Sequence, residues 1–146
     1  MELTAKIIQK YTKYSQPQLK AKAVTIFNKF IRERDKYNDI GFDCCSCGKG
    51  KSIKLMHAGH YFSAGHNGAI EFDERNVNGQ CSHCNTFEHG NLIGYQKFMV
   101  KKYGQSVIDE LEIKRNLPFK PDRFYFILII IEYSAKVKQI VKYHTY

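Results

Sequence analysis

The stretch that decides the fold runs from residue 42 to residue 85 and reads FDCCSCGKGKSIKLMHAGHYFSAGHNGAIEFDERNVNGQCSHCN. A Cys-x-x-Cys pair lies near each of its ends, Cys44 with Cys47 and Cys81 with Cys84. Each pair can offer two thiolates, and four thiolates suit one tetrahedral Zn²⁺. The spacing therefore predicts a structural four-cysteine zinc site that ties the two ends together, with redox chemistry or chance pairing as the alternatives. Cys45 is expected to be a bystander, although it can replace Cys44.

Polar residues suited to phosphodiester cleavage lie between the two pairs and just after the second. A neutral histidine can take the proton of an attacking water near neutral pH, and a divalent ion can neutralise the phosphate. We expect His60 to be the general base and Asn76 to hold it in position. We expect His57 and Asn85 to bind a catalytic Mg²⁺ or Mn²⁺, with Glu88 on the same helical face as Asn85. The ordinary alternatives are a turn residue for Asn76 and a helix N-cap for Asn85.

The net charge of the chain points to a polyanionic partner. The 146 residues include 23 Lys and Arg against 14 Asp and Glu, a net charge of +9. The charge is +5 over residues 1–40, −1 over 41–90 and +5 over 91–146. Basic segments on both sides of a slightly acidic centre favour nucleic acid, here DNA, over a membrane, and a solvated surface with a basic bias is the alternative. Candidate DNA contacts are Arg32, Arg34, Arg75, Lys97, Lys101 and Lys102. For Arg75, a surface salt bridge is nearly as good an interpretation.

Composition and hydropathy exclude several classes of protein. A hydrophobic content of 43% and an aromatic content of 14% exclude a disordered tail protein. The longest apolar run covers residues 124–131 and is too short to span a bilayer. The first residues lack the apolar segment of a secretory signal, so a soluble cytoplasmic protein without a disulfide framework is expected.

The chain length predicts a single α+β domain over residues 1–146. Its expected parts are a basic N-terminal helix (17–40), a zinc-knuckle core (41–103) and C-terminal helices (104–146). Helices are predicted over 17–36, 92–103, 107–114 and 122–142, and a hairpin of strands over 53–62 and 69–72. Asn91 and Gly104 delimit the second helix, and Ser106 with Asp109 resembles a capping box for the third.

Ordered motifs over residues 30–112 carry a resemblance to a known family. They read FIRERD (30–35), CSCG (45–48), AGHY (58–61), ERNVNGQCSHCN (74–85), GNLIGY (90–95) and GQSVIDELE (104–112). In these motifs the chain resembles the phage lambda NinG family, also called Rap, of recombination endonucleases. More distantly it is similar to the HNH, or ββα-metal, nucleases, especially those of the phage endonuclease VII type.

The resemblance implies a zinc-stapled ββα-metal core and a divalent-metal endonuclease acting in a phage-infected bacterium. Its implied substrates are Holliday junctions, D-loops and other branched DNA of phage recombination. His60 matches the general-base histidine, Asn76 the central asparagine and Asn85 the last metal ligand, while Glu88 matches a glutamate of the endonuclease VII type. His57 stands where the family pattern has Asp, so better use of Mn²⁺ than of Mg²⁺ is a hypothesis.

Two other functions compete with a structure-selective endonuclease. One is a zinc-stapled DNA-binding module without catalysis, and the other is a non-selective or sequence-specific HNH nuclease. A binding module has no need for His57, His60 and Asn85 beside the zinc, so these residues favour an enzyme. Because a four-way junction has two-fold symmetry, a homodimer is expected, with the apolar start of the last helix as its interface.

Overall fold

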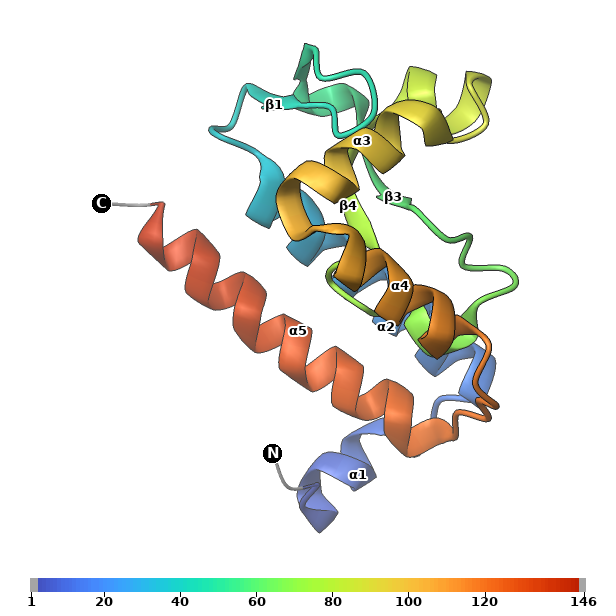
Figure 1. Cartoon of the computed structure of the whole chain (residues 1–146). Helices are drawn as coiled ribbons and strands as arrows, with labels where there is room; N and C mark the ends of the chain where they lie inside the picture. The colour runs from blue at the N-terminus through green and yellow to red at the C-terminus, as the bar shows by residue number, and fades with distance from the viewer. Residues whose placement is uncertain (1–2, 145–146) are drawn as a thin grey trace. The chain divides into compact units, whose positions relative to one another are not determined.

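The computed structural model describes residues 3–144, which fall into two compact units (Figure 1). Unit 1 comprises the described residues 3–33 and 120–144, and unit 2 comprises Arg34–Phe119. Each unit is described below by itself. Unit 2 contains the predicted core over residues 41–103 and adds the end of the preceding helix and the helix that follows. The composition is mixed α and β, as the sequence predicted.

Unit 1 is helical. Its elements are α1 (Ala5–Tyr11), most of α2 (Gln16–Asp35) and α5 (Arg123–Tyr143). Phe27 of α2 meets Tyr133 of α5 edge-on, with ring centroids 4.7 Å apart, an arrangement that aromatic pairs favour. Asp122 caps α5 by accepting a hydrogen bond from the Tyr125 N–H, close to the predicted start of that helix.

The apolar first turns of α5, the predicted dimer interface, are largely buried or half-buried within this single chain, although Phe124 is exposed. Phe126 and Ile127 are buried within this single chain. Among the described residues, no helix combines the length and the apolar composition needed to cross a membrane.

Unit 2 is built on two small antiparallel sheets. Strand β1 (Gly41–Asp43) pairs with β2 (Gly50–Ser52), and β3 (Met56–His60) pairs with β4 (Val77–Cys81). Short helical turns separate them: η1 (Ile53–Leu55), η2 (Gly68–Ile70) and η3 (His83–Phe87). Helices α3 (Leu92–Tyr103) and α4 (Gln105–Arg115) follow. Asn91 and Gly104 border α3, which confirms that prediction.

The second strand of the main hairpin is not where the sequence predicted it. Residues 69–72 do not form a strand; η2 covers the first half of that segment and a turn the second half, and Ile70 is buried against α3 and α4. The partner of β3 is β4, whose register sets His57 opposite Gln80 and His60 opposite Val77. Every residue of β4 is buried, including Asn78 and Gln80, so the strand lacks the apolar alternation that marks strands in a sequence.

The predicted capping box before α4 is also wrong. The helix begins at Gln105, directly after Gly104, and the structure gives no side-chain cap there. The Asp109 carboxylate instead accepts a hydrogen bond from Gln105 Nε2 at 2.9 Å.

Helix α3 holds the core of unit 2 together. Tyr95 and Met99 of this helix are fully buried with Ile108 and Leu111 of α4. The Tyr95 hydroxyl donates a 2.6 Å hydrogen bond to the Gly59 carbonyl of β3. This bond joins the helix to the strand that carries the candidate catalytic histidines.

Candidate metal and catalytic site

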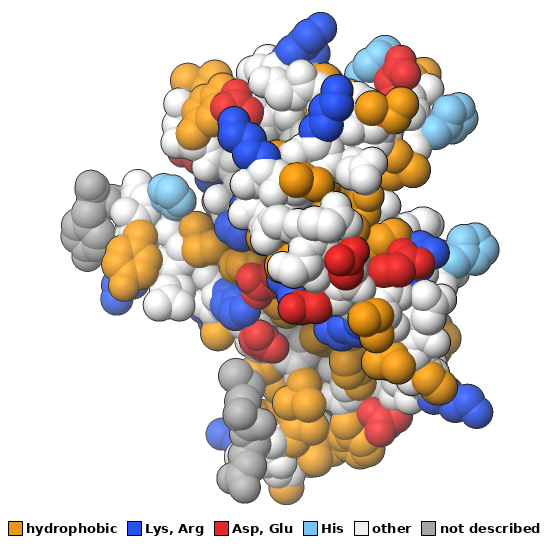
Figure 2. Space-filling model, viewed as in Figure 1, with side chains coloured by type: hydrophobic (Ala, Val, Ile, Leu, Met, Phe, Trp, Pro, Cys, Tyr) orange, Lys and Arg blue, Asp and Glu red, His pale blue; other side chains and the backbone are white. Residues whose placement is uncertain are grey.

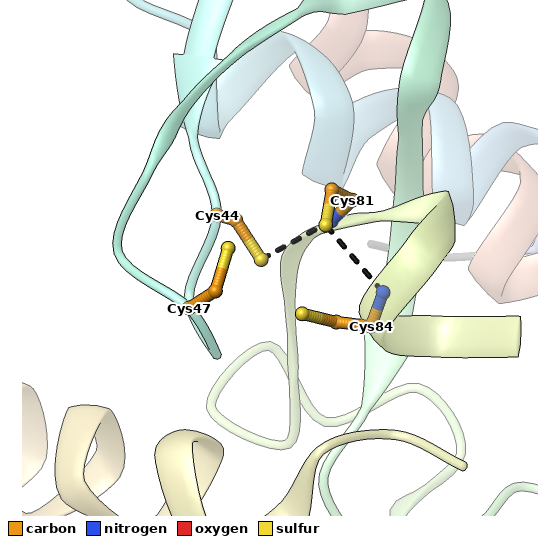
Figure 3. A group of neighbouring side chains, drawn as sticks. All are labelled: Cys44, Cys47, Cys81 and Cys84. Carbon is orange, nitrogen blue, oxygen red and sulfur yellow. Dashed lines mark hydrogen bonds between the residues drawn. The ribbon is translucent and has the colours of Figure 1, made fainter. Parts of the chain in front are cut away.

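The four paired cysteines converge from the two sheets. Cys44 directly follows β1, Cys81 ends β4, and Cys84 lies in η3. The Gly48 N–H donates to the Cys44 carbonyl at 2.8 Å, which closes a tight turn around Cys47. Gly48 has a φ of +70°, in the region that favours glycine. Figure 3 shows the four side chains turned toward a common centre.

The sulfur atoms of the four cysteines lie within 4.8 Å of one another. Around zinc, Zn–S bonds of about 2.3 Å place tetrahedral sulfur atoms roughly 3.8 Å apart, so a small closure of this cluster would suit the ion. Cys45 lies outside the group and is buried in the core beside Tyr95. The structure thus brings together the four predicted ligands, a set that can hold a metal such as zinc.

Hydrogen bonds to sulfur and burial act in opposite directions on the pKa values of these cysteines. The Cys81 N–H donates to Cys44 Sγ at 3.3 Å, and Asn91 Nδ2 donates to Cys84 Sγ at 3.5 Å. A hydrogen bond from Cys45, together with backbone N–H groups, lowers the pKa of Cys44 to about 3 against the opposing effect of burial. Burial raises the pKa of Cys84 to about 12. Four thiolates so close together need a cation, because thiolates repel one another and the metal-bound form is the deprotonated one.

His60 is oriented by the backbone. Its Nε2 lies 3.0 Å from the Glu71 carbonyl oxygen, which can only accept a hydrogen bond. Nε2 therefore carries the proton, and Nδ1 of the neutral ring keeps a free lone pair. Burial lowers the pKa of His60 below the usual histidine value, and the hydrogen bond to Glu71 offsets only part of this shift. The side chain borders a pocket of about 860 Å³.

Asn76 holds the loop that follows His60. Its side chain is fully buried. Oδ1 accepts a hydrogen bond from the Phe62 N–H at 2.9 Å, while Nδ2 donates to the Phe62 carbonyl at 3.0 Å and to the Ile70 carbonyl at 3.3 Å. The Asn76 carbonyl accepts from the Tyr61 N–H, directly after His60. These contacts go beyond those of an ordinary turn residue.

His57 and Asn85 contact each other across the hairpin end. His57 Nδ1 lies 2.9 Å from Asn85 Nδ2, and Asn85 also lines the pocket that His60 borders. Side chains alternate along a strand, so β3 directs His57 and His60 to opposite faces of the hairpin. Asn85 contacts His57 and also lines the pocket that His60 borders. Asn85 lies within η3 rather than at a helix N-cap.

Glu88 is not brought to this pair. Its carboxylate lies 3.3 Å from His83 Nε2 on the exposed surface, and Glu88 is absent from the pocket lining.

Arg34, a predicted DNA contact, makes several hydrogen bonds within unit 2. Its guanidinium binds the Asp35 carboxylate at 2.6 and 2.8 Å and donates to the carbonyls of Glu74 and Val77. Burial is the largest single effect and lowers the pKa of Arg34, but the hydrogen bond to Asp35 and the attraction of nearby negative groups together outweigh it, and the pKa is raised. These bonds all lie within unit 2 and occupy most of the donors of this guanidinium, so a contact between Arg34 and phosphate stays a prediction.

The other candidate DNA contacts differ in their exposure and in the partners that they already bind. Arg75 is paired with Asp73 at 3.0 Å and with Glu110 at 2.7 Å, the salt-bridge interpretation that the sequence left open. Lys97, Lys101 and Lys102 are exposed on α3, and Lys102 donates to Asn78 Oδ1 at 3.3 Å. Arg32 is half-buried in unit 1.

Sequence reasoning missed three residues that line the pocket, His66, His89 and Arg115. No motif marks them, and they reach the pocket only through the tertiary fold. For His89, the one local signal of an unusual backbone is that Gly90 follows it. His89 itself has a φ of +48°.

Comparison with known proteins places these residues in a family context. The family described as "Bacteriophage Lambda NinG protein" matches residues 2–143. The protein named "Protein ninG" from Escherichia phage 933W is 39% identical to this chain over 89 residues. Those of the same name from Escherichia phage lambda and Salmonella phage P22 are 38% identical over 89 residues and 39% identical over 85 residues. The matched segment covers 61%, 61% and 58% of this chain but 42%, 41% and 39% of those relatives, so it spans about two fifths of their length. No solved structure matches the chain. Since the family match extends over nearly all of the sequence, the chain belongs to the NinG protein family of bacteriophages.

Proposed function

We propose that this protein is a metal-dependent endonuclease that hydrolyses phosphodiester bonds in branched DNA during phage recombination. The observation that carries the proposal is the pocket that brings His60 and Asn85 together beside the cysteine cluster. A base, a candidate metal ligand and a depression large enough for a sugar-phosphate backbone are the minimum for this chemistry.

His60 supplies the base. Nε2 is committed to the Glu71 carbonyl, so Nδ1 is the nitrogen that takes the proton from the attacking water. The lowered pKa of His60 keeps the ring neutral at pH 7, the state that a general base requires. Asn76 acts indirectly, since its bonds to the loop after His60 fix the direction of the ring.

His57 and Asn85 are the residues that would hold the divalent ion. Their nearest nitrogen atoms are 2.9 Å apart, and half a turn of the Asn85 amide would exchange its nitrogen for the carboxamide oxygen. Neighbouring ligands on an octahedral ion with bonds of about 2.1 Å lie roughly 3 Å apart, so the spacing fits. When bound, the ion supplies positive charge to the phosphate and the leaving oxygen. An imidazole ligand in place of a carboxylate favours Mn²⁺ over Mg²⁺.

Basic and aromatic side chains of unit 1 support a nucleic-acid partner. Lys10, Lys13, Tyr11, Tyr14 and Lys22 line a shallow pocket of about 300 Å³. Lys22 Nζ lies 4.4 Å from the centre of the Tyr14 ring, which keeps a cation and a flat surface side by side. Ammonium groups suit phosphates, and aromatic rings suit bases.

The test is cleavage of end-labelled DNA. A synthetic four-way junction and a linear duplex of matched sequence are each incubated with Mg²⁺, with Mn²⁺ and without added divalent ion. We expect metal-dependent cuts near the branch point, faster in Mn²⁺, with the duplex intact. Equal cutting of both substrates would keep a nuclease and reject its selectivity. Binding without cutting in either metal would reject the enzyme in favour of a zinc-stapled DNA-binding module.

The proposal includes two copies of the chain on one junction, in the cytoplasm of the bacterial host. Paired cuts in a two-fold symmetric substrate need two active sites. Light scattering of the complex with an uncleaved junction measures this directly, and a single copy per junction would reject the dimer.

A further inference from the structure

The pocket beside His60 contains one strongly basic side chain. Among the described residues that line it, Arg115 is the one Lys or Arg. It ends α4, and its exposed side-chain fraction is 31%. Its Nη2 lies 3.2 Å from a Glu112 carboxylate oxygen, while its Nε is buried and has no hydrogen-bond partner. The guanidinium thus forms one ion pair, with Glu112, and lines the pocket with the rest of its surface.

Two successive contacts hold the Arg115 guanidinium in place. Its central carbon lies 4.4 Å from the centre of the Phe62 ring, so the flat group rests against an aromatic surface. The backbone of Phe62 is held on both sides by Asn76, through its N–H and its carbonyl. Asn76, Phe62 and Arg115 thus form a continuous chain of contacts from the base of the hairpin to the pocket.

The surroundings of Arg115 make its positive charge important. Figure 2 shows acidic side chains gathered over the middle of the viewed face, where α4 runs, and Asp109, Glu110 and Glu112 of that helix are exposed. An anion that enters the pocket along this helix meets negative charge. Of the described residues that line the pocket, Arg115 is the basic side chain that can offset it, together with any metal that Asn85 holds.

We propose that Arg115 binds a non-bridging oxygen of the scissile phosphate and stabilises the negative charge that develops there as water attacks. The inference rests on the proposed nuclease function and adds a phosphate-binding residue to it. A guanidinium suits this role because it stays charged and presents flat N–H edges that match phosphate oxygens.

The test compares two variants of Arg115 with a matched control. Arg115→Lys keeps the charge and loses the planar group, whereas Arg115→Gln keeps a planar, polar end and loses the charge. Lys114→Gln removes the same charge one residue away, where the side chain binds Asp73 and does not line the pocket. Single-turnover cleavage of the junction and thermal unfolding are measured for each protein.

We expect Arg115→Gln to slow cleavage by about 100-fold or more, since charge-stabilising donors typically contribute that much. Arg115→Lys should recover at least tenfold of this loss, and Lys114→Gln should stay within threefold of the unaltered protein. Unfolding temperatures should be alike for the two Arg115 variants. Equal rates for Arg115→Lys and Arg115→Gln would overturn the proposal and leave Arg115 as a packing residue.

A binding measurement separates this inference from the proposed function. Deoxythymidine 3′,5′-bisphosphate is titrated into each protein without added divalent ion and followed by its ³¹P resonances. We expect Arg115→Gln to weaken its binding about tenfold and Lys114→Gln to leave it unchanged. If the unaltered protein cuts no DNA, the nuclease is rejected, and this titration alone decides whether Arg115 binds phosphate. Equal binding by the unaltered protein and Arg115→Gln overturns the inference whatever the cleavage result.

Discussion

His60 shows how one hydrogen bond can assign a chemical role. The ring is held through Nε2 by a backbone carbonyl, which has no proton to give, so the other nitrogen is fixed as the basic one. A carboxylate partner would instead have raised the pKa of the ring by attraction between charges. Here burial is the larger effect, and the pKa of His60 is lowered.

The pH dependence of cleavage follows from that direction. His60 acts when neutral, and a lowered pKa widens the pH range of the neutral form toward acid. We expect single-turnover cleavage in Mn²⁺ to stay nearly constant from pH 8 to about 6.5, the ordinary histidine pKa, and to fall only at lower pH. His60→Ala should lose about 100-fold or more at pH 7.5 while junction binding stays intact. A profile that rises as the pH falls toward 6 would show that a protonated group drives the reaction instead.

The candidate residues of the site could be named from the sequence only where a motif fixes their spacing. Cys44, Cys47, Cys81 and Cys84 are spaced as ligand pairs, and the structure brings them together. Arg115 lies far along the chain from His60 and reaches the pocket only because α4 packs beside η2. No local pattern records such a contact.

At the scale of elements, α3 and β4 show opposite limits of prediction. Asn91 and Gly104 mark the ends of α3 because capping depends on local backbone geometry, and local geometry is written in adjacent residues. β4 could not be predicted as a strand from the sequence, because two of its buried positions hold the polar residues Asn78 and Gln80. Burying an amide nitrogen becomes favourable when a distant partner accepts its hydrogen bond, as Tyr95 does for Asn78 Nδ2 and Ser46 for Gln80 Nε2.

The close contact between α3 and the turn around Cys47 predicts that a Gly→Ala substitution in this helix lowers stability. A Cβ placed on Gly94 would lie 2.1 Å from the Ser46 carbonyl oxygen, which belongs to the backbone of that turn. Gly→Ala within a helix normally stabilises by up to about 1 kcal/mol. We expect Gly94→Ala to destabilise unit 2 instead, by about 1–3 kcal/mol, since the backbone must shift. Chemical denaturation measures the change, with Gly65→Ala as the control, because its Cβ would meet only Ser63 Oγ at 3.9 Å.

The cysteine cluster predicts a separate effect on unit 2. Because metal binding is coupled to folding, Cys81→Ser should lower both the zinc content and the unfolding temperature of the protein. Cys45→Ser, at a buried position outside the cluster, should keep one zinc per chain even if it is less stable. Elemental analysis of purified protein, followed by thermal unfolding with and without chelator, distinguishes the two. Equal zinc content in both variants would contradict a four-cysteine site.

At the scale of the whole molecule, charge and chemistry are divided between parts of the chain. The candidate base and metal ligands come from the segment with a net charge of −1, while both flanking segments carry +5. Acidic surroundings favour a bound cation, and basic surroundings favour the DNA backbone. This division could be predicted from the sequence, because it needs only counts. The grouping of residues into two units could not, because α2 runs from one unit into the other.

The division of charge leads to a prediction about salt. Each phosphate neutralised by a lysine releases counterions, so the logarithm of the binding constant falls with the logarithm of salt concentration by about 0.9 per contact. Replacing Lys10, Lys13 and Lys22 together by Gln should therefore reduce that slope by about 2–3 for a junction. The matched control, Lys49, Lys51 and Lys54 replaced by Gln, removes the same charge from the acidic segment and should change the slope by less than about 1. Fluorescence anisotropy from 50 to 300 mM salt, without divalent ion, measures both. Equal slopes for the two triple variants would mean that DNA is attracted by the net charge of the molecule rather than held by the lysine and tyrosine side chains of unit 1.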